Sequence, residues 1–142
     1  LESFDGRCPI EGEIDSFVKE HVLPPNVDIV ENYSSLLELS KDFVEFYKKF
    51  PNKTVISHIP YPVESGYFLW LQHHKLLGEF EGPYPLIDVG SMLHTKGEDP
   101  TSLSSYLDKY GITVDVVGND HCANYDTACA HAVYNHLLTV KS

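Results

Sequence analysis

The segment from Asp120 to Leu138 (DHCANYDTACAHAVYNHLL) limits most strongly what this chain can form. Apolar residues recur along it at helical spacing and predict one long helix: Ala128, Ala130, Ala132, Val133, Leu137 and Leu138. Asn124 is a suitable N-cap, which puts Asp126 in the first turn, where the helix dipole favours a carboxylate. His121 then lies in the preceding loop. An imidazole and a carboxylate five residues apart make a candidate site, although this spacing also fits an Asp that only interacts with the dipole.

Helical and extended patterns alternate along the rest of the chain. Asn32 or Ser34 is expected to cap an amphipathic helix that reaches Phe50, and residues 63–77 return to helical spacing. Thr101 is expected to cap a third helix, over 102–110, which Gly111 closes. Extended segments are expected at 54–57 and 112–117, with short strands between residues 8 and 22, and 86–89 is expected to be a strand or a strand-to-helix junction. This alternation predicts an α/β fold, with the last helix packed across a sheet.

Length and composition predict a single domain over residues 1–142, since 142 residues that are 42% hydrophobic can bury a sizeable core. No run of about 18 apolar residues is present, which predicts no membrane-spanning helix. No signal peptide is apparent either. The unpatterned cysteines Cys8, Cys122 and Cys129 argue against a disulfide scaffold. The chain is therefore expected to be intracellular and cytoplasmic.

The formal net charge of −11 argues against a protein that grips nucleic acid through a broad basic face. It remains compatible with an enzyme that holds phosphates through metal ions, because cations invert the charge of a carboxylate cluster. Three carboxylates stand at expected element ends: Glu2, Glu64 and Asp126. If they converge, each pair at about 4 Å repels by roughly 4 kcal/mol at an effective dielectric of about 20. Cations would offset this repulsion, and oxygen ligands suit Mg²⁺ or Mn²⁺.

The chain resembles the DEDDh, or DnaQ-like, 3′–5′ exonucleases in the order of its segments. Leu1-Glu2-Ser3 is similar to the family's first motif, residues 54–64 (TVISHIPYPVE) to the middle motif, and residues 121–126 (HCANYD) to the last. Residues 85–88 and 102–112 also resemble family segments, so the likeness covers nearly the whole chain from Phe43 onward. Two departures stand out. The first family Asp would precede Leu1, and the middle carboxylate is Glu64 rather than Asp.

The resemblance implies a ribonuclease H-like fold, with a mixed central sheet flanked by helices. It implies hydrolysis of phosphodiester bonds from the 3′ end of single-stranded DNA or RNA, with two Mg²⁺ or Mn²⁺ ions. Glu2, Glu64 and Asp126 would hold the metals, and His121 would be the general base. Tyr61 would contact substrate by stacking on a base. His58 is expected to order the turn and to border the substrate, and Asp88 resembles a family position outside the catalytic set.

Three alternatives stay open. One is a catalytically inactive DEDDh-like module that binds a nucleic-acid end or a protein partner. Another is a zinc site built from His121, Cys122, Cys129 and His136, although no Cys-x-x-Cys motif is present. The third is an interaction domain whose acidic residues are only solvated.

Overall fold

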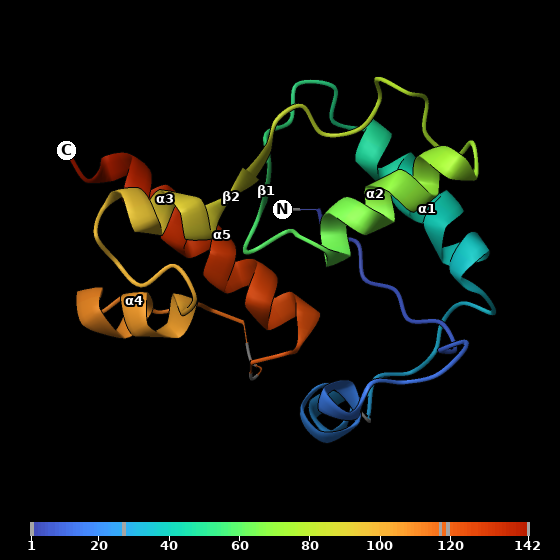
Figure 1. The fold of residues 1–142 in the computed structure, drawn as a ribbon, viewed down its shortest axis with the longest axis horizontal. Helices are drawn as coiled ribbons and strands as arrows, with labels where there is room; N and C mark the ends of the chain where they lie inside the picture. The colour runs from blue at the N-terminus through green and yellow to red at the C-terminus, as the bar shows by residue number, and fades with distance from the viewer. Residues whose placement is uncertain (1, 27, 117, 119, 142) are drawn as a thin grey trace. The chain divides into compact units, whose positions relative to one another are not determined.

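The computed structural model describes residues 2–26, 28–116, 118 and 120–141, and its chain forms two units that are interleaved in sequence (Figure 1). Unit 1 comprises residues 1–53 and 69–82, and unit 2 comprises residues 54–68 and 83–142. Helix α2 (Val63–His73) carries the chain from unit 2 into unit 1. Each unit is described by itself below.

Unit 1 is built around helix α1 (Leu36–Lys48), which buries Ser40, Val44 and Tyr47 along one face. Ser35 is its N-cap, and the side chain of Ser35 accepts a hydrogen bond from the backbone N–H of Glu38. The Glu38 carboxylate in turn accepts bonds from the backbone N–H and hydroxyl of Ser34. This arrangement is a variant of the capping box in which the Glu38 carboxylate binds Ser34, one residue before the N-cap, and the Ser35 hydroxyl satisfies the N–H of Glu38, which has no partner within the helix.

Aromatic packing joins the start of the chain to α1. The Phe4 ring lies 5.7 Å from the ring of Phe43 and 5.9 Å from that of Phe46. The second segment of unit 1, residues 69–82, is joined to the same helix by an ion pair between Lys48 Nζ and Glu81, at 3.2 Å. Residues adjacent to Phe4, including Glu2, lie outside regular secondary structure.

The strands expected between residues 8 and 22 are not formed; that prediction was wrong. A short π-helix, η1 (Val18–Val22), and a 3₁₀ turn, η2 (Pro24–Asn26), follow an irregular segment instead. The apolar residues here do not alternate, and Leu23 donates its N–H back to Val18 O, so the backbone bonds locally rather than to a neighbouring strand. Pro24 and Pro25 have no N–H to contribute to a sheet.

The capping box gives a test of unit 1. Replacing Ser35 by Ala removes the side-chain acceptor and is expected to lower the free energy of unfolding by about 1 kcal/mol. Replacing it by Gly is expected to cost only a few tenths of a kcal/mol, because Gly is itself tolerated at the N-cap. Urea unfolding followed by the fluorescence of Trp70, the single tryptophan and a member of unit 1, measures both. Equal losses in the two variants would contradict the capping role.

Unit 2 contains a parallel pair of strands, β1 (Val55–Ser57) and β2 (Leu86–Asp88), with Val55 opposite Leu86 and Ser57 opposite Asp88. Strand β2 passes directly into α3 (Val89–Thr95), and two further helices follow, α4 (Leu103–Tyr110) and α5 (Ala123–Thr139). Helix α5 contacts α3, α4 and β1 (Figure 1). The α/β class and the packing of the last helix against a strand are therefore confirmed.

The core of unit 2 lies between these three helices and β1. Its buried residues are Val89, Leu93, Tyr106, Leu107, Cys129, Val133 and Leu137, with Ile56 of β1 packed against them. Helix α4 begins at the Ser102 cap, whose hydroxyl accepts from the N–H of Ser105, and ends at Gly111 in the left-handed conformation (φ 64°). Gly111 was predicted to close this helix, and it does so.

Several local expectations differ from the structure. Cys122 rather than Asn124 is the N-cap of α5, and Ser102 rather than Thr101 caps α4. Residues 112–116 are not a strand, and Leu1 and Val117 lie outside the described residues. The sheet of the described residues has two parallel strands, so the expected mixed central sheet is not observed there. No helix in the described part of the chain is both long and apolar enough to cross a membrane.

Candidate functional site

The turn that follows β1 is held at two points. Nε2 of His58 lies 2.9 Å from the carbonyl oxygen of Pro100, so this nitrogen carries a proton and donates it. The backbone N–H of Ile59 donates to Oδ1 of Asp88 at 2.9 Å. Ile59 has a positive φ of 53°, a conformation that a β-branched residue rarely adopts. Contacts from distant parts of unit 2 thus fix the turn.

Asp88 is the centre of this arrangement. Besides Ile59, its carboxylate accepts from the N–H groups of Gly90 and Ser91 and from the Ser91 hydroxyl. Partial burial acts to raise its pKa, but the bonds from the Ser91 hydroxyl and from the three N–H groups prevail, and the pKa of Asp88 is lowered. Asp88 therefore stays ionised and caps α3 while it binds the turn.

The space between these segments explains the residue at position 90. A Cβ on Gly90 would lie 2.9 Å from the Pro100 carbonyl oxygen and 3.5 Å from Cγ1 of Ile59. The first distance is shorter than real Cβ contacts allow, so only glycine fits without a backbone shift. Close packing of α3 against the turn and against Pro100 depends on this glycine.

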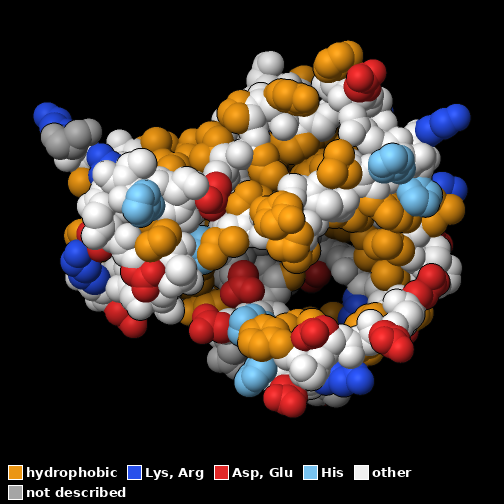
Figure 2. Space-filling view, viewed as in Figure 1, with side chains coloured by type: hydrophobic (Ala, Val, Ile, Leu, Met, Phe, Trp, Pro, Cys, Tyr) orange, Lys and Arg blue, Asp and Glu red, His pale blue; other side chains and the backbone are white. Residues whose placement is uncertain are grey.

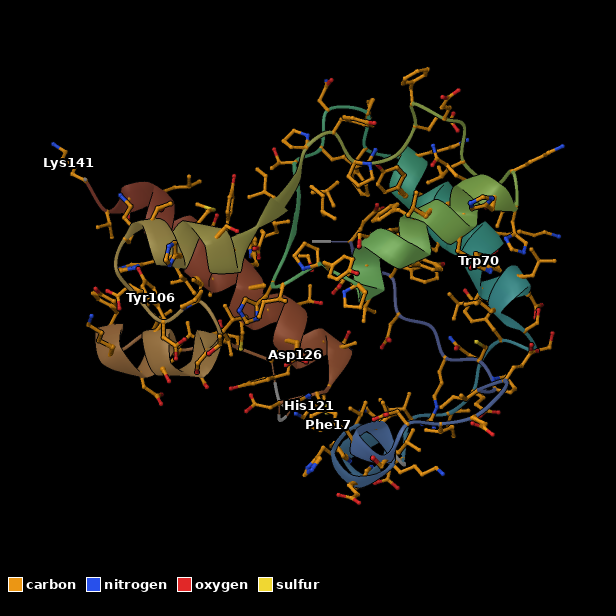
Figure 3. All side chains as sticks on the ribbon, in the orientation of Figure 1. Phe17, Trp70, Tyr106, His121, Asp126 and Lys141 are labelled. Carbon is orange, nitrogen blue, oxygen red and sulfur yellow. The ribbon has the colours of Figure 1, made fainter. Side chains whose placement is uncertain are left out.

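The start of α5 places the predicted imidazole and carboxylate together. Both carboxylate oxygens of Asp126 accept from the backbone N–H of His121, at 3.1 and 3.3 Å. His121 has a positive φ of 72°. Asp126 lies on the surface of α5, and Figure 3 labels it on the helix with His121 in the loop before it. Asp126 is in the first turn, as predicted, and it holds the loop that carries His121.

The electrostatics of Asp126 connect this loop to the turn after β1. Partial desolvation raises the pKa of Asp126, and the charge of Asp120 adds to the shift, while the N–H of His121 and the charges of His121 and His58 act in the opposite direction. The charges of His58 and His121 therefore both favour the ionised form of Asp126. These three side chains come from the carboxyl end of β1 and the amino end of α5.

The other predicted ligands are not part of this group. Glu64 is half-buried in the first turn of α2, directly after the β1 turn. Glu2 is exposed and belongs to unit 1, so the description of unit 2 does not include it. Tyr61 lies in the held turn, and its side chain is 80% exposed, as a residue that contacts substrate requires.

The donor chemistry of Glu64 and Asp126 fits a hard divalent cation, because both offer carboxylate oxygens. Among the described residues, however, no group of three or more His, Cys, Asp or Glu side chains is arranged to hold a metal ion. A complete site would need these carboxylates to approach one another or to be joined by donors from elsewhere. The same finding holds for the residues of the zinc alternative that the structure describes. One of them, His136, has its Nδ1 2.8 Å from the Tyr106 hydroxyl, within hydrogen-bond distance.

Sequence reasoning missed two features of unit 2. The first is the role of Asp88, although the pattern Asp88-Val89-Gly90-Ser91 carries the signal of an N-cap. The second is a pocket of about 520 Å³ away from the candidate site. It is lined by residues of α3, of α4, of the loop between them and of the end of the chain around α5, among them Glu98, Tyr106 and Tyr110. Glu98 accepts bonds there from Lys109 Nζ and the Tyr110 hydroxyl.

The charge of the surface agrees with the composition. Figure 2 shows Asp and Glu side chains on the visible faces of both units, with Lys and Arg fewer. Comparison of the chain with protein-family models, with curated proteins and with solved structures gives no significant match.

Proposed function

We propose that this chain is a metal-dependent 3′–5′ exonuclease of the DEDDh type, which removes nucleotides from the 3′ end of single-stranded DNA or RNA. The observation that carries the proposal is the start of α5, where the Asp126 carboxylate binds the backbone N–H of His121 in the preceding loop. His58 and Tyr61 follow the carboxyl end of β1, and ligands of parallel sheets bind beyond the carboxyl ends of the strands. The order of the sequence motifs adds support.

The connection of the two strands also supports a ribonuclease H-like fold. Strands β1 and β2 are parallel neighbours, joined through a segment that includes α2, and α5 packs against β1. In the proposal, the turn after β1, the first turn of α2 and the start of α5 supply site residues. Glu2 is the remaining carboxylate that the sequence resemblance implies as a metal ligand.

Each residue has a defined task. Glu64 and Asp126 would hold divalent metal ions, which when bound activate water and stabilise the leaving 3′ oxygen. Accepting the His121 N–H leaves lone pairs on both oxygens of Asp126, so the two tasks of this carboxylate are compatible. His121 takes the proton of the attacking water near neutral pH. Tyr61 stacks on a base of the substrate, and His58 keeps the turn in place.

The test is degradation of 5′-labelled single-stranded oligonucleotides, DNA and RNA in parallel, with Mg²⁺, with Mn²⁺ and with EDTA. The chain as printed is compared with the same chain preceded by one aspartate, which restores the family's first motif. Metal-dependent shortening from the 3′ end, lost in His121→Ala and Glu64→Gln, is the expected result. Glu79→Gln is the matched control, because it makes the same chemical change at an exposed position of unit 1.

A second candidate function is a module that binds a nucleic-acid 3′ end or a protein partner without cutting. It is favoured by the middle motif, where Glu64 stands in place of the family's Asp. Binding of a labelled 3′ end without shortening, with the added aspartate present, would favour this function over the exonuclease. Absence of both binding and cleavage would reject both nucleic-acid functions.

A further inference from the structure

Asp88 connects three segments of unit 2 that are distant in sequence or separate in structure. It ends β2, caps α3, and accepts the N–H of Ile59, which is 29 residues away. Ile59 adjoins His58, whose imidazole donates to Pro100 over a separation of 42 residues. One carboxylate thus links the end of β2 and the start of α3 to the turn after β1.

The turn would not keep this shape by itself. A positive φ is unfavourable for isoleucine, and such a conformation persists only where the surrounding structure determines it. The Ile59 side chain is 48% exposed, so burial of that side chain contributes little to holding it. The bond to Asp88 and the contact between His58 and Pro100 hold the backbone at the first two residues of the turn. The N–H groups of Ser65 and Gly66 bind the carbonyls of Pro60 and Pro62 further along the turn.

We infer that Asp88 is a positioning residue: it fixes the turn over 58–62 and so sets the place of Tyr61 and of Glu64 in the reaction. This inference rests on the proposed function. Asp88 does not touch the reacting atoms, and it acts through the Ile59 N–H. Its other bonds, to Gly90 and Ser91, anchor the carboxylate to α3, so that the turn is held against a rigid element. Catalytic geometry is sensitive to such support, because a displacement of about 1 Å can cost about 10²-fold in rate.

Four variants separate positioning from stability. Asp88→Ser keeps an N-cap for α3 but shortens the side chain by one atom and removes the second oxygen, which releases the Ile59 N–H. Asp88→Asn keeps one carbonyl oxygen for that N–H and caps α3 equally well. Ser91→Ala removes only the hydroxyl bond to Asp88. Leu137→Ala destabilises the core of unit 2 near the other end of α5, roughly 16 Å along the helix from Asp126.

Two measurements are made on each variant: the steady-state kinetics of oligonucleotide degradation and the hydrogen exchange of the Ile59 amide by NMR. Asp88→Ser is expected to lower kcat by about 10- to 100-fold and to speed exchange at Ile59. Asp88→Asn restores most of kcat, and Ser91→Ala and Leu137→Ala stay close to the parent at temperatures where they are folded. The rescue by Asn and the normal kcat of Leu137→Ala are results that a merely structural role would not produce.

The inference is overturned if Asp88→Ser keeps the parental kcat, or if Leu137→Ala, while folded, loses as much activity as Asp88→Ser. It is also overturned if Ile59 exchange is the same in Asp88→Ser and the parent. Failure of the proposed function is distinguishable, because then the parent itself shows no metal-dependent shortening. The Ile59 exchange still reports whether Asp88 holds the turn in that case.

Discussion

The proposed exonuclease function predicts that an Asp126→Asn variant loses nuclease activity and yet folds as stably as the parent protein at neutral pH. The amide cannot replace a negatively charged oxygen on a metal ion. Metal ions contribute several kcal/mol of charge stabilisation to the transition state, so the rate should fall by at least about 10²-fold. The carbonyl oxygen of Asn can still accept the N–H of His121, so the loop keeps one of its bonds.

The expected stability follows from the direction of the pKa shift. Partial desolvation raises the pKa of Asp126 in the folded state above its value in the unfolded chain. The folded protein therefore binds this proton more tightly, and ionisation of Asp126 costs stability as the pH rises from about 4 through the folded pKa. Asparagine has no such cost. The free energy of unfolding of Asp126→Asn should equal or slightly exceed that of the parent at neutral pH. Below about pH 4 it should be lower than that of the parent.

Urea unfolding at neutral and acidic pH measures this difference, and oligonucleotide degradation measures the activity of the same samples. Asp115→Asn, at an exposed position in the same unit, is the matched control and should change neither. Full activity in Asp126→Asn would contradict the metal-binding role. A marked loss of stability at neutral pH would instead mean that the charge of Asp126 is needed to hold the loop.

The largest effect on folding is expected from Leu93→Ala. Leu93 lies on α3, is fully buried and packs in the core of unit 2 with residues of α4 and α5. Its truncation removes apolar contacts and leaves a cavity, which should lower the free energy of unfolding by about 2–5 kcal/mol. Thermal unfolding followed by far-UV circular dichroism measures the loss.

Leu138→Ala makes the same chemical change on α5, where the leucine side chain is 62% exposed. This control should stay within about 0.5 kcal/mol of the parent. Similar losses in the two variants would mean that α3 does not pack in the core of unit 2 as described. Because Trp70 belongs to unit 1, its fluorescence in Leu93→Ala also reports whether the two units unfold together.

The parts of the fold that could be predicted are those with strong local patterns. Helices α1 and α5 follow long apolar repeats, and Gly111 marks the end of α4, so their presence was expected. Their N-caps were misplaced by one to three positions, which is common where several polar residues can act as caps. Residues 86–89 were expected to form a strand or a strand-to-helix junction, and they form the junction, since α3 begins directly after β2.

In the candidate site, too, the local contacts could be predicted and the contacts between distant residues could not. His121 and Asp126 are five residues apart, so one local turn of chain brings them together. The bonds from Ile59 to Asp88 and from His58 to Pro100 span 29 and 42 residues, and they depend on strand pairing that no single segment encodes. The role of Glu2 as a metal ligand comes from the sequence resemblance and stays a prediction.

The interleaving of the two units in sequence has a practical consequence for dissecting the molecule. Chain segments leave one unit for the other after residues 53, 68 and 82, so neither unit is a continuous stretch. A cut after residue 53 divides unit 1, a cut after residue 82 divides unit 2, and a cut after residue 68 divides both, so the two fragments always share at least one unit. Isolated halves are therefore poor reagents, and circular permutation, which keeps every residue, is the suitable way to move the chain ends.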